Sequence, residues 1–134
     1  MIGTRLLIEV IKKIQDKATQ PYPQDDSRVS YTRLLTRDSG KIDWKKSVSE
    51  IDCKIRALNP WPGTWTELSG IRLKILEAHP IKVSLPRNEK NIFEYHGTLI
   101  MQCDDGFLQL DSVQLEGKKI LSGADFVRGY KNRL

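Results

Sequence analysis

Apolar residues recur along the chain with two different spacings, and each spacing predicts a different kind of element. In residues 4–17 they recur every three or four positions, as in an amphipathic helix; these positions are Leu6, Leu7, Val10, Ile11 and Ile14. Residues 47–58 show the same spacing, and Ser47 with Glu50 forms the capping-box pattern that starts a helix. An asparagine–proline pair then ends this second helix.

In residues 64–75, beyond the second helix, apolar residues alternate with polar ones, as in strands with one buried face. An Asp-Gly turn within residues 104–106 indicates a second hairpin. The predicted strands pair as two hairpins and comprise residues 64–68, 71–75, 98–103 and 107–115. A short apolar run at residues 81–85, between two prolines, is a candidate fifth strand. Ser122 and Asp125 predict the start of a short final helix. The pattern predicts a mainly β fold with flanking helices, a small and partly open β-barrel.

A polar segment with two prolines, residues 18–26, follows the first helix. Proline fixes its own φ and disfavours helix in the residue before it, so we expect an extended linker. The first helix begins almost at Met1, and its apolar stripe therefore needs a partner that this chain is not expected to contain. We interpret residues 1–27 as a helix plus linker from a truncated chain, and residues 28–134 as the folded domain.

Composition limits the class of protein. The 134 residues are 39% hydrophobic and 29% charged, which fits one ordinary globular domain. The longest apolar run, residues 2–14, is interrupted by charges and predicts no membrane span. The N-terminus lacks a secretory pattern, so we expect a cytoplasmic protein. Cys53 and Cys103 have neither the number nor the spacing of a disulfide framework or a zinc site, and we expect two buried thiols.

The charge balance favours an anionic partner without naming one. Lys and Arg number 22 against 17 Asp and Glu, which gives a net charge of +5. The positive excess lies toward the two ends of the chain, whereas residues 104–116 carry four carboxylates and no cation. A polarised surface follows only if the fold gathers the basic ends on one face; otherwise the charges form a mixed, solvated surface.

The chain also carries a series of short motifs, in order and well spaced. They are Ile42-Asp43-Trp44, Ile55-Arg56-Ala57, Asn59-Pro60-Trp61-Pro62-Gly63, Lys74, Gln114, Glu116-Gly117-Lys118-Lys119, Asp125-Phe126 and Gly129. The series resembles the C-terminal domain of the bacterial methionyl-tRNA formyltransferases. The resemblance runs from about residue 3 to residue 129, and Pro23-Gln24-Asp25 is similar to the end of the linker that joins the two domains of that family.

The resemblance implies a parent enzyme that formylates the amino group of methionine on initiator tRNA in translation initiation. Its catalytic Asn, His and Asp would lie outside this chain, as would the site for the formyl donor, 10-formyltetrahydrofolate. Residues 1–27 would hold the last helix of that catalytic domain plus the linker, and residues 28–134 an OB-like domain that binds tRNA. We therefore expect this chain alone to be inactive, without a catalytic residue, metal or cofactor. Its partners would be initiator tRNA and its own N-terminal catalytic domain.

Phosphate binding would come from basic side chains, because each cation that neutralises a phosphate releases counterions. The candidate tRNA-binding residues are Lys118, Lys119, Arg72, Lys74, Lys45, Lys46, Lys54 and Arg56. Lys118 and Lys119 lie at a predicted strand end, where both can stay solvated and reach the backbone of an RNA. Arg72 and Lys74 share the outward face of one predicted strand.

Aromatic and histidine residues receive structural interpretations. Trp61, between two prolines, could stack on a base, but we expect it to fill the junction between helix and barrel. We expect Trp65 in the barrel core, Trp44 as an anchor at the helix start, and His79 as a strand-end or loop residue. Two alternatives stay open: a domain of another formyltransferase or of a formyltetrahydrofolate hydrolase, and a free-standing barrel that binds RNA or a protein. The basic motif ending in Lys119 argues against the first.

Overall fold

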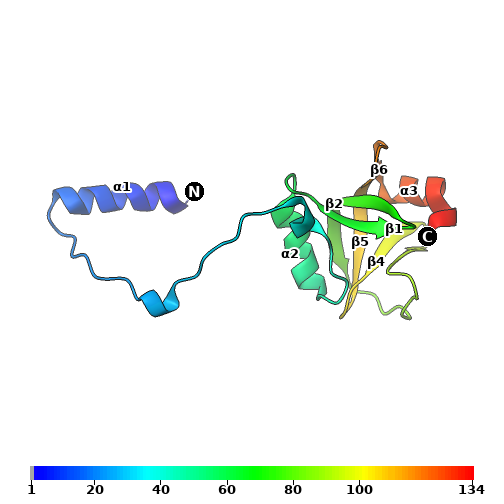
Figure 1. The fold of residues 1–134 in the computed structure, drawn as a ribbon, viewed down its shortest axis with the longest axis horizontal. Coiled ribbons are helices and arrows are strands. Elements are labelled where there is room, and N and C mark those ends of the chain that lie inside the picture. The colour runs from blue at the N-terminus through cyan, green and yellow to red at the C-terminus, as the bar shows by residue number, and fades with distance from the viewer. Residues whose placement is uncertain (1) are drawn as a thin grey trace. The chain divides into compact units, whose positions relative to one another are not determined.

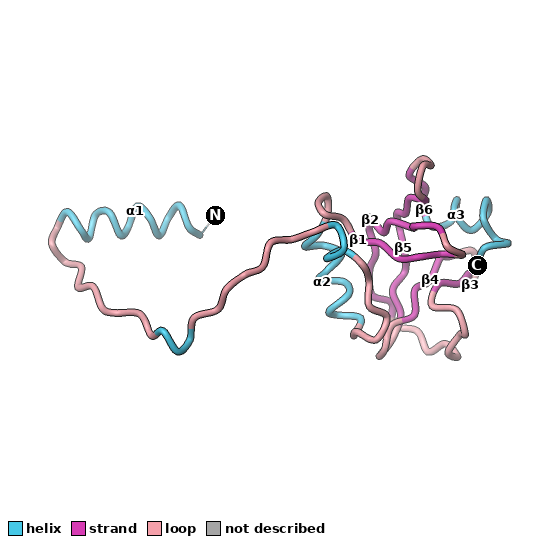
Figure 2. The backbone as a smooth tube through the Cα atoms, in the orientation of Figure 1, coloured by secondary structure: helices cyan, strands magenta, loops and turns pink. Residues whose placement is uncertain are grey.

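The computed structural model describes residues 2–134, which divide into two units, residues up to 33 and residues 34–134. The first unit contains helix α1 (Ile2–Gln15), close to its predicted bounds, and an extended segment (Figure 2). One 3-10 turn, η1 (Asp26–Arg28), interrupts this segment, and the Asp25 carboxylate caps it by accepting the Ser27 backbone N–H at 3.0 Å. The predicted apolar positions of α1 are all exposed.

The second unit is built on one antiparallel sheet. Its strands are β1 (Thr64–Leu68), β2 (Ile71–Ile81), β3 (Ile92–Tyr95), β4 (Thr98–Gln102), β5 (Phe107–Leu115) and β6 (Ile120–Ser122). The strand order is β1-β2-β5-β4-β3, with β6 paired to β5. Figure 2 labels the six strands. Strand β5 is central, because β2 pairs along one edge while β4 and β6 share the other edge.

Two helices cover this sheet. Helix α2 (Val48–Leu58) packs on β2, and α3 (Gly123–Tyr130) packs on β4 and β5. The register between β2 and β5 shifts around Glu77, and such a bulge bends a strand. The core consists of apolar side chains from the sheet and both helices, among them Ile51, Ile55, Leu73, Leu108, Val113 and Phe126. The prediction of a mainly β fold with flanking helices, built as a small and partly open barrel, is confirmed, and the sheet forms a half-barrel.

Both predicted helix caps are present. The Ser47 hydroxyl accepts the Glu50 backbone N–H at 3.2 Å, and the Glu50 carboxylate accepts the Ser47 backbone N–H at 3.2 Å. The Ser122 hydroxyl accepts the Asp125 backbone N–H at 3.1 Å. The α2 start receives a further bond, because the Asp105 carboxylate accepts the Val48 backbone N–H at 2.7 Å. This bond ties the β4–β5 turn to the helix.

Several strand bounds differ from those predicted. Strand β2 continues to Ile81 and includes Pro80, whereas the rest of the 81–85 run lies in a loop (Figure 2). Strand β1 pairs only with residues 71–75, so the later half of β2 has an edge at which the missing N–H of a proline is tolerated. Strands β3 and β6 were not predicted. Each is short, with four and three residues respectively.

Smaller features complete the fold. Two further 3-10 turns are η2 (Arg37–Gly40) and η3 (Lys131–Arg133). Cys103 is buried as expected, and burial raises the pKa of its thiol to about 12. The expectation of a buried Cys53 is wrong, because this residue faces outward from α2 between the buried Ile51 and Ile55. Among the helices of residues 2–134, none is both long and apolar enough to cross a membrane.

Candidate nucleic-acid interface

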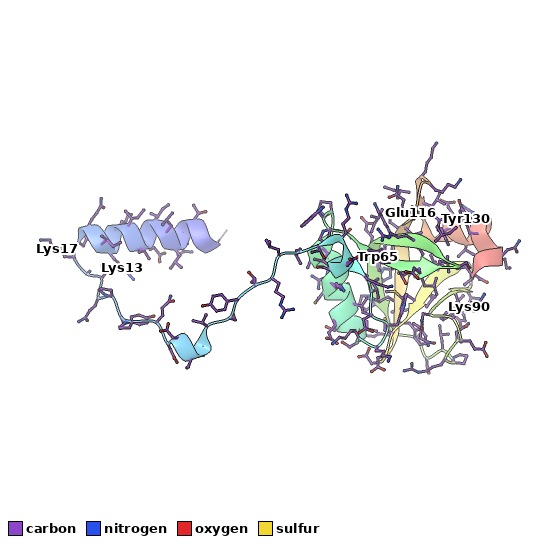
Figure 3. The ribbon with its side chains drawn as sticks, in the orientation of Figure 1. Lys13, Lys17, Trp65, Lys90, Glu116 and Tyr130 are labelled. Carbon is purple, nitrogen blue, oxygen red and sulfur yellow. The ribbon has the colours of Figure 1, made fainter. Side chains whose placement is uncertain are left out.

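An open cleft of about 440 Å³ lies between the turn after α2 and the paired ends of β2 and β5. Its charged lining residues are Arg37, Arg72, Lys74 and Glu116, and its aromatic lining residues are Trp61 and Trp65. The lining therefore contains three positively charged side chains and one negatively charged side chain. Figure 3 labels Trp65 on β1 and Glu116 just after β5. A cleft with this excess of positive charge favours an anionic ligand.

Strand β2 directs two of the candidate cations outward. Leu73 and Ile75 are fully buried, and side chains alternate along a strand, so Arg72 and Lys74 lie on the opposite face. The pairing between β2 and β5 places Lys74 beside Gln114. The carbonyl of Arg72 accepts the Glu116 backbone N–H at 2.9 Å. Both cations are thereby held next to the end of β5.

Trp65 lines the cleft beneath the Arg72 side chain. It is buried as predicted, with 7% of its surface exposed, but it lies on the outward face of the sheet beside Lys74 and not in the core cluster of the barrel. The guanidinium carbon of Arg72 lies 4.0 Å from the centre of its ring, a cation–π geometry that holds Arg72 over the indole. The indole N–H donates to the Arg37 carbonyl at 3.0 Å and so fixes the η2 turn at the edge of the cleft.

The η2 turn approaches the start of β1 closely. A Cβ atom at Gly40 would lie 1.9 Å from the Gly63 carbonyl oxygen, so only glycine allows this approach. Arg37, the first residue of this turn, was not among the candidates predicted from the sequence. Its position depends on a contact between two glycines 23 residues apart, which no local pattern reveals.

The structure contradicts the expectation for Trp61. Instead of filling the junction between α2 and the sheet, its side chain is 62% exposed and lines the cleft. The turn is closed without the indole, because the Gly63 backbone N–H donates to the Leu58 carbonyl at 2.8 Å and the Asn59 side chain donates to the Leu76 carbonyl. Trp44 is partly buried against the core, as expected for an anchor near the start of α2.

The β5–β6 hairpin places two further candidates beside the cleft. Gly117 lines the cleft, and the exposed Lys118 and Lys119 follow it at the hairpin tip, which projects from the sheet in Figure 1. The Gln114 side-chain amide donates to the Lys118 carbonyl at 2.9 Å and fixes the tip backbone. The structure therefore gathers Arg72, Lys74, Lys118 and Lys119 in one region.

The other four candidates, Lys45, Lys46, Lys54 and Arg56, lie on α2 or just before it. Within residues 2–134, none of them is among the residues that line the cleft. Lys46 pairs with Glu50 at 3.2 Å, and Arg56 pairs with Asp52 at 3.0 Å. The Asp52 carboxylate also raises the pKa of Arg56. Lys54 donates to the Lys41 carbonyl at 2.6 Å, and Lys45 is exposed. Most of these cations already have local partners.

His79 has a polar partner within the sheet. His79 lies near the end of β2, as expected, and its Nδ1 atom is 2.6 Å from the Asp111 carboxylate. In the described part of the chain, no three His, Cys, Asp or Glu side chains are placed to hold a metal ion. The cleft beside Trp61 is therefore the strongest candidate site, and its three cations favour an anionic ligand.

Comparisons with known proteins give a consistent result. A family model described as formyl transferase, C-terminal domain, matches residues 34–131. Proteins named methionyl-tRNA formyltransferase from Dehalococcoides mccartyi strain 195, Rickettsia bellii and Gluconobacter oxydans are 38%, 37% and 37% identical over 98%, 97% and 96% of this chain. The matched regions are 42%, 41% and 40% of those proteins. The chain thus spans about two fifths of their length.

The fold is also similar to part of a solved structure. HypX from Aquifex aeolicus matches 94% of this chain with a TM-score of 0.60, and the match covers 23% of HypX. The sequence identity is 14%, so this likeness concerns the fold alone.

Proposed function

Because the chain belongs to the family of formyl transferase C-terminal domains, we propose that it is the non-catalytic, tRNA-binding part of a methionyl-tRNA formyltransferase. The parent enzyme would transfer a formyl group from 10-formyltetrahydrofolate to methionine on initiator tRNA, in the cytoplasm. Both the transfer and the binding of the formyl donor belong to the part of the enzyme outside this chain. The names of the relatives support the substrate, and their length leaves room for a catalytic domain.

The observation that carries the proposal is the gathering of basic side chains around one cleft. Arg72 and Lys74 lie within it, and Lys118 and Lys119 extend it along the hairpin tip. Phosphate contacts of this kind supply affinity and orientation but no base reading. We therefore propose that this domain positions the tRNA while the rest of the enzyme selects it. The α2 cations Lys45, Lys46, Lys54 and Arg56 contribute less, because local partners occupy three of them.

Helix α1 fits the same proposal. Its apolar stripe is exposed in this chain, and amphipathic helices of globular proteins normally bury such a stripe. We propose that the stripe packs on the N-terminal catalytic domain of the parent enzyme. Residues 1–27 would then be the end of that domain plus the linker, and the tRNA-binding domain would follow.

The test is binding of the purified chain to initiator tRNA over a series of salt concentrations. Binding should weaken steeply with salt, and the Lys118→Ala/Lys119→Ala double variant should lower the slope of log K against log salt by about two. The matched control is Lys46→Ala/Arg56→Ala, which removes the same charge from α2 and should change the slope less.

Two outcomes would contradict the proposal. Equal slopes for the two double variants would mean that the hairpin tip is not a special contact. No binding even at low salt would mean that the basic cleft does not bind RNA by itself, and a domain from a formyltransferase with another substrate would then explain the family match better.

A further inference from the structure

We propose that the Trp61 indole is a stacking platform for one unpaired nucleobase, so that the cleft binds a single-stranded or bulged nucleotide rather than duplex backbone alone. This inference rests on the proposed function, since it specifies which part of an RNA enters the same cleft. It depends on three observations: the exposure of the ring, the stiffness of its turn, and the cations around it.

Exposure distinguishes Trp61 from the other two tryptophans. Its side chain is 62% exposed, whereas Trp44 is partly buried against the core and Trp65 is buried. Trp65 also lines the cleft, but the Arg72 guanidinium lies over its ring. Of the two indoles that line the cleft, Trp61 is therefore the one whose face is open to a ligand.

The turn that carries Trp61 is stiff. Pro60 and Pro62 flank the residue, and each proline fixes its own φ. The Gly63 backbone N–H and the Asn59 side chain close the turn by donating to the Leu58 and Leu76 carbonyls. The backbone that carries the ring is thus restrained before a ligand arrives, which lowers the entropy lost on binding.

The surroundings of the ring fit a nucleotide. The cleft of about 440 Å³ is within the usual size range of small-ligand sites. A base stacked on Trp61 would bring its phosphate into the same cleft as Arg72 and Lys74. Stacking on an aromatic ring accepts every base, so this contact adds affinity without sequence reading.

An apolar protein surface fits the ring less well. Arg37, Arg72 and Lys74 share the cleft with Trp61. A covering apolar surface would remove water from these cations without giving them a partner, which is unfavourable. A nucleotide satisfies both kinds of group, because its base covers the indole and its phosphate meets the cations.

The experiment is a tryptophan-fluorescence titration of the chain with two RNA probes at one low salt concentration. One probe is a short single-stranded oligoadenylate, and the other is a blunt RNA duplex with the same number of phosphates. The single strand should quench the emission more strongly than the duplex, because in a blunt duplex only the terminal base pairs have an open face that can stack on Trp61.

Two Trp61 variants and one control assign the effect. Trp61→Ala should weaken single-strand binding about tenfold while duplex binding stays unchanged, and Trp61→Phe should keep most of the affinity but lose the quenching. Neither should unfold the domain, since Trp61 lies outside the core cluster. The control is Tyr95→Ala, which removes a partly exposed aromatic ring from β3 and should change neither probe.

The inference fails if the single strand leaves the emission unchanged, as it would if the ring were reserved for a protein surface. It also fails if Trp61→Ala binds both probes like the wild type. If the Lys118→Ala/Lys119→Ala variant still lowers the salt slope in that case, the proposed function stands without this inference. If that slope is also unchanged, both are wrong.

Discussion

Helices α1 and α2 are both amphipathic, yet only α2 buries its apolar face within its own unit. The apolar residues Ile51, Ile55 and Leu58 of α2 are buried to 1%, 1% and 9% exposure. The corresponding positions of α1 are between 37% and 59% exposed. A 3.6-residue pattern therefore predicts that a helix has an apolar face, but it does not identify the surface that covers this face.

The two helices also differ in what stabilises them locally. Helix α2 begins with a capping box and a further bond from Asp105, whereas the first turn of α1 holds no acidic residue. An isolated helix of 14 residues is marginal in water, because nucleation is costly and tertiary packing supplies most helix stability. Helix α1 thus needs a partner surface more than α2 does, in agreement with the proposed packing on a catalytic domain.

The largest expected difference between the two helices comes from deleting one isoleucine in each. Ile55→Ala leaves a cavity in the core of the second unit and should lower its free energy of unfolding by about 2–5 kcal/mol. Ile11→Ala, the matched variant in α1, should leave that value unchanged. Urea denaturation followed by the fluorescence of the tryptophans, all in the second unit, measures both. A comparable loss for Ile11→Ala would show that α1 packs on the domain in this chain.

The strand predictions show where a sequence pattern is sufficient. Alternation found β1 and the first half of β2, and the Asp104-Asp105-Gly106 turn indicated the hairpin of β4 and β5. Alternation stopped β2 at residue 75, since the bulge near Glu77 breaks the period and Pro80 suggests a strand end. Strand β6 has only three residues, and its place depends on pairing with β5, a tertiary contact.

The positions of some candidate-site residues could be predicted for similar reasons. Strand alternation was enough to predict that Arg72 and Lys74 point outward, and the predicted strand end was enough to predict that Lys118 and Lys119 are exposed. Arg37 and Trp61 could not be placed from the sequence, because their positions depend on the contact of η2 with the start of β1 and on the hydrogen bonds that close the turn after α2. Local patterns describe faces, whereas a cleft is formed by segments that the fold brings together.

A second pair of variants replaces one glycine in each unit by alanine. Gly40→Ala would place a Cβ atom 1.9 Å from the Gly63 carbonyl oxygen, and the forced shift should cost about 1–3 kcal/mol in unfolding free energy. Gly3→Ala meets no atom within 4 Å and should instead raise the helix content of α1 slightly, since alanine favours helix. Urea denaturation reports the first effect and far-ultraviolet circular dichroism the second. Wild-type stability for Gly40→Ala would mean that η2 does not approach β1 this closely in solution.

The smallest expected effect concerns the α2 cap and is visible as a dependence on pH. The Ser47 backbone N–H, with Lys46 and the Ser47 hydroxyl, lowers the pKa of the Glu50 carboxyl from its ordinary value of 4.5. A lowered pKa in the folded state means that the ionised cap stabilises the fold above that ordinary value, and that this contribution is lost as the pH falls through the lowered pKa. Glu50→Gln removes the titrating group, so its melting temperature should fall less than that of the wild type on acidification.

The α1 counterpart of this change is Glu9→Gln. Glu9 is also an exposed carboxylate with a basic partner four residues away, because it pairs with Arg5 at 3.3 Å. It lies on the unpacked helix, so Glu9→Gln should follow the wild-type melting curve of the second unit at every pH. Parallel curves for wild type and Glu50→Gln would mean that the cap titrates alike in the folded and unfolded chain. A shift for Glu9→Gln would instead link α1 to the domain, and the difference between the two helices would then be one of degree.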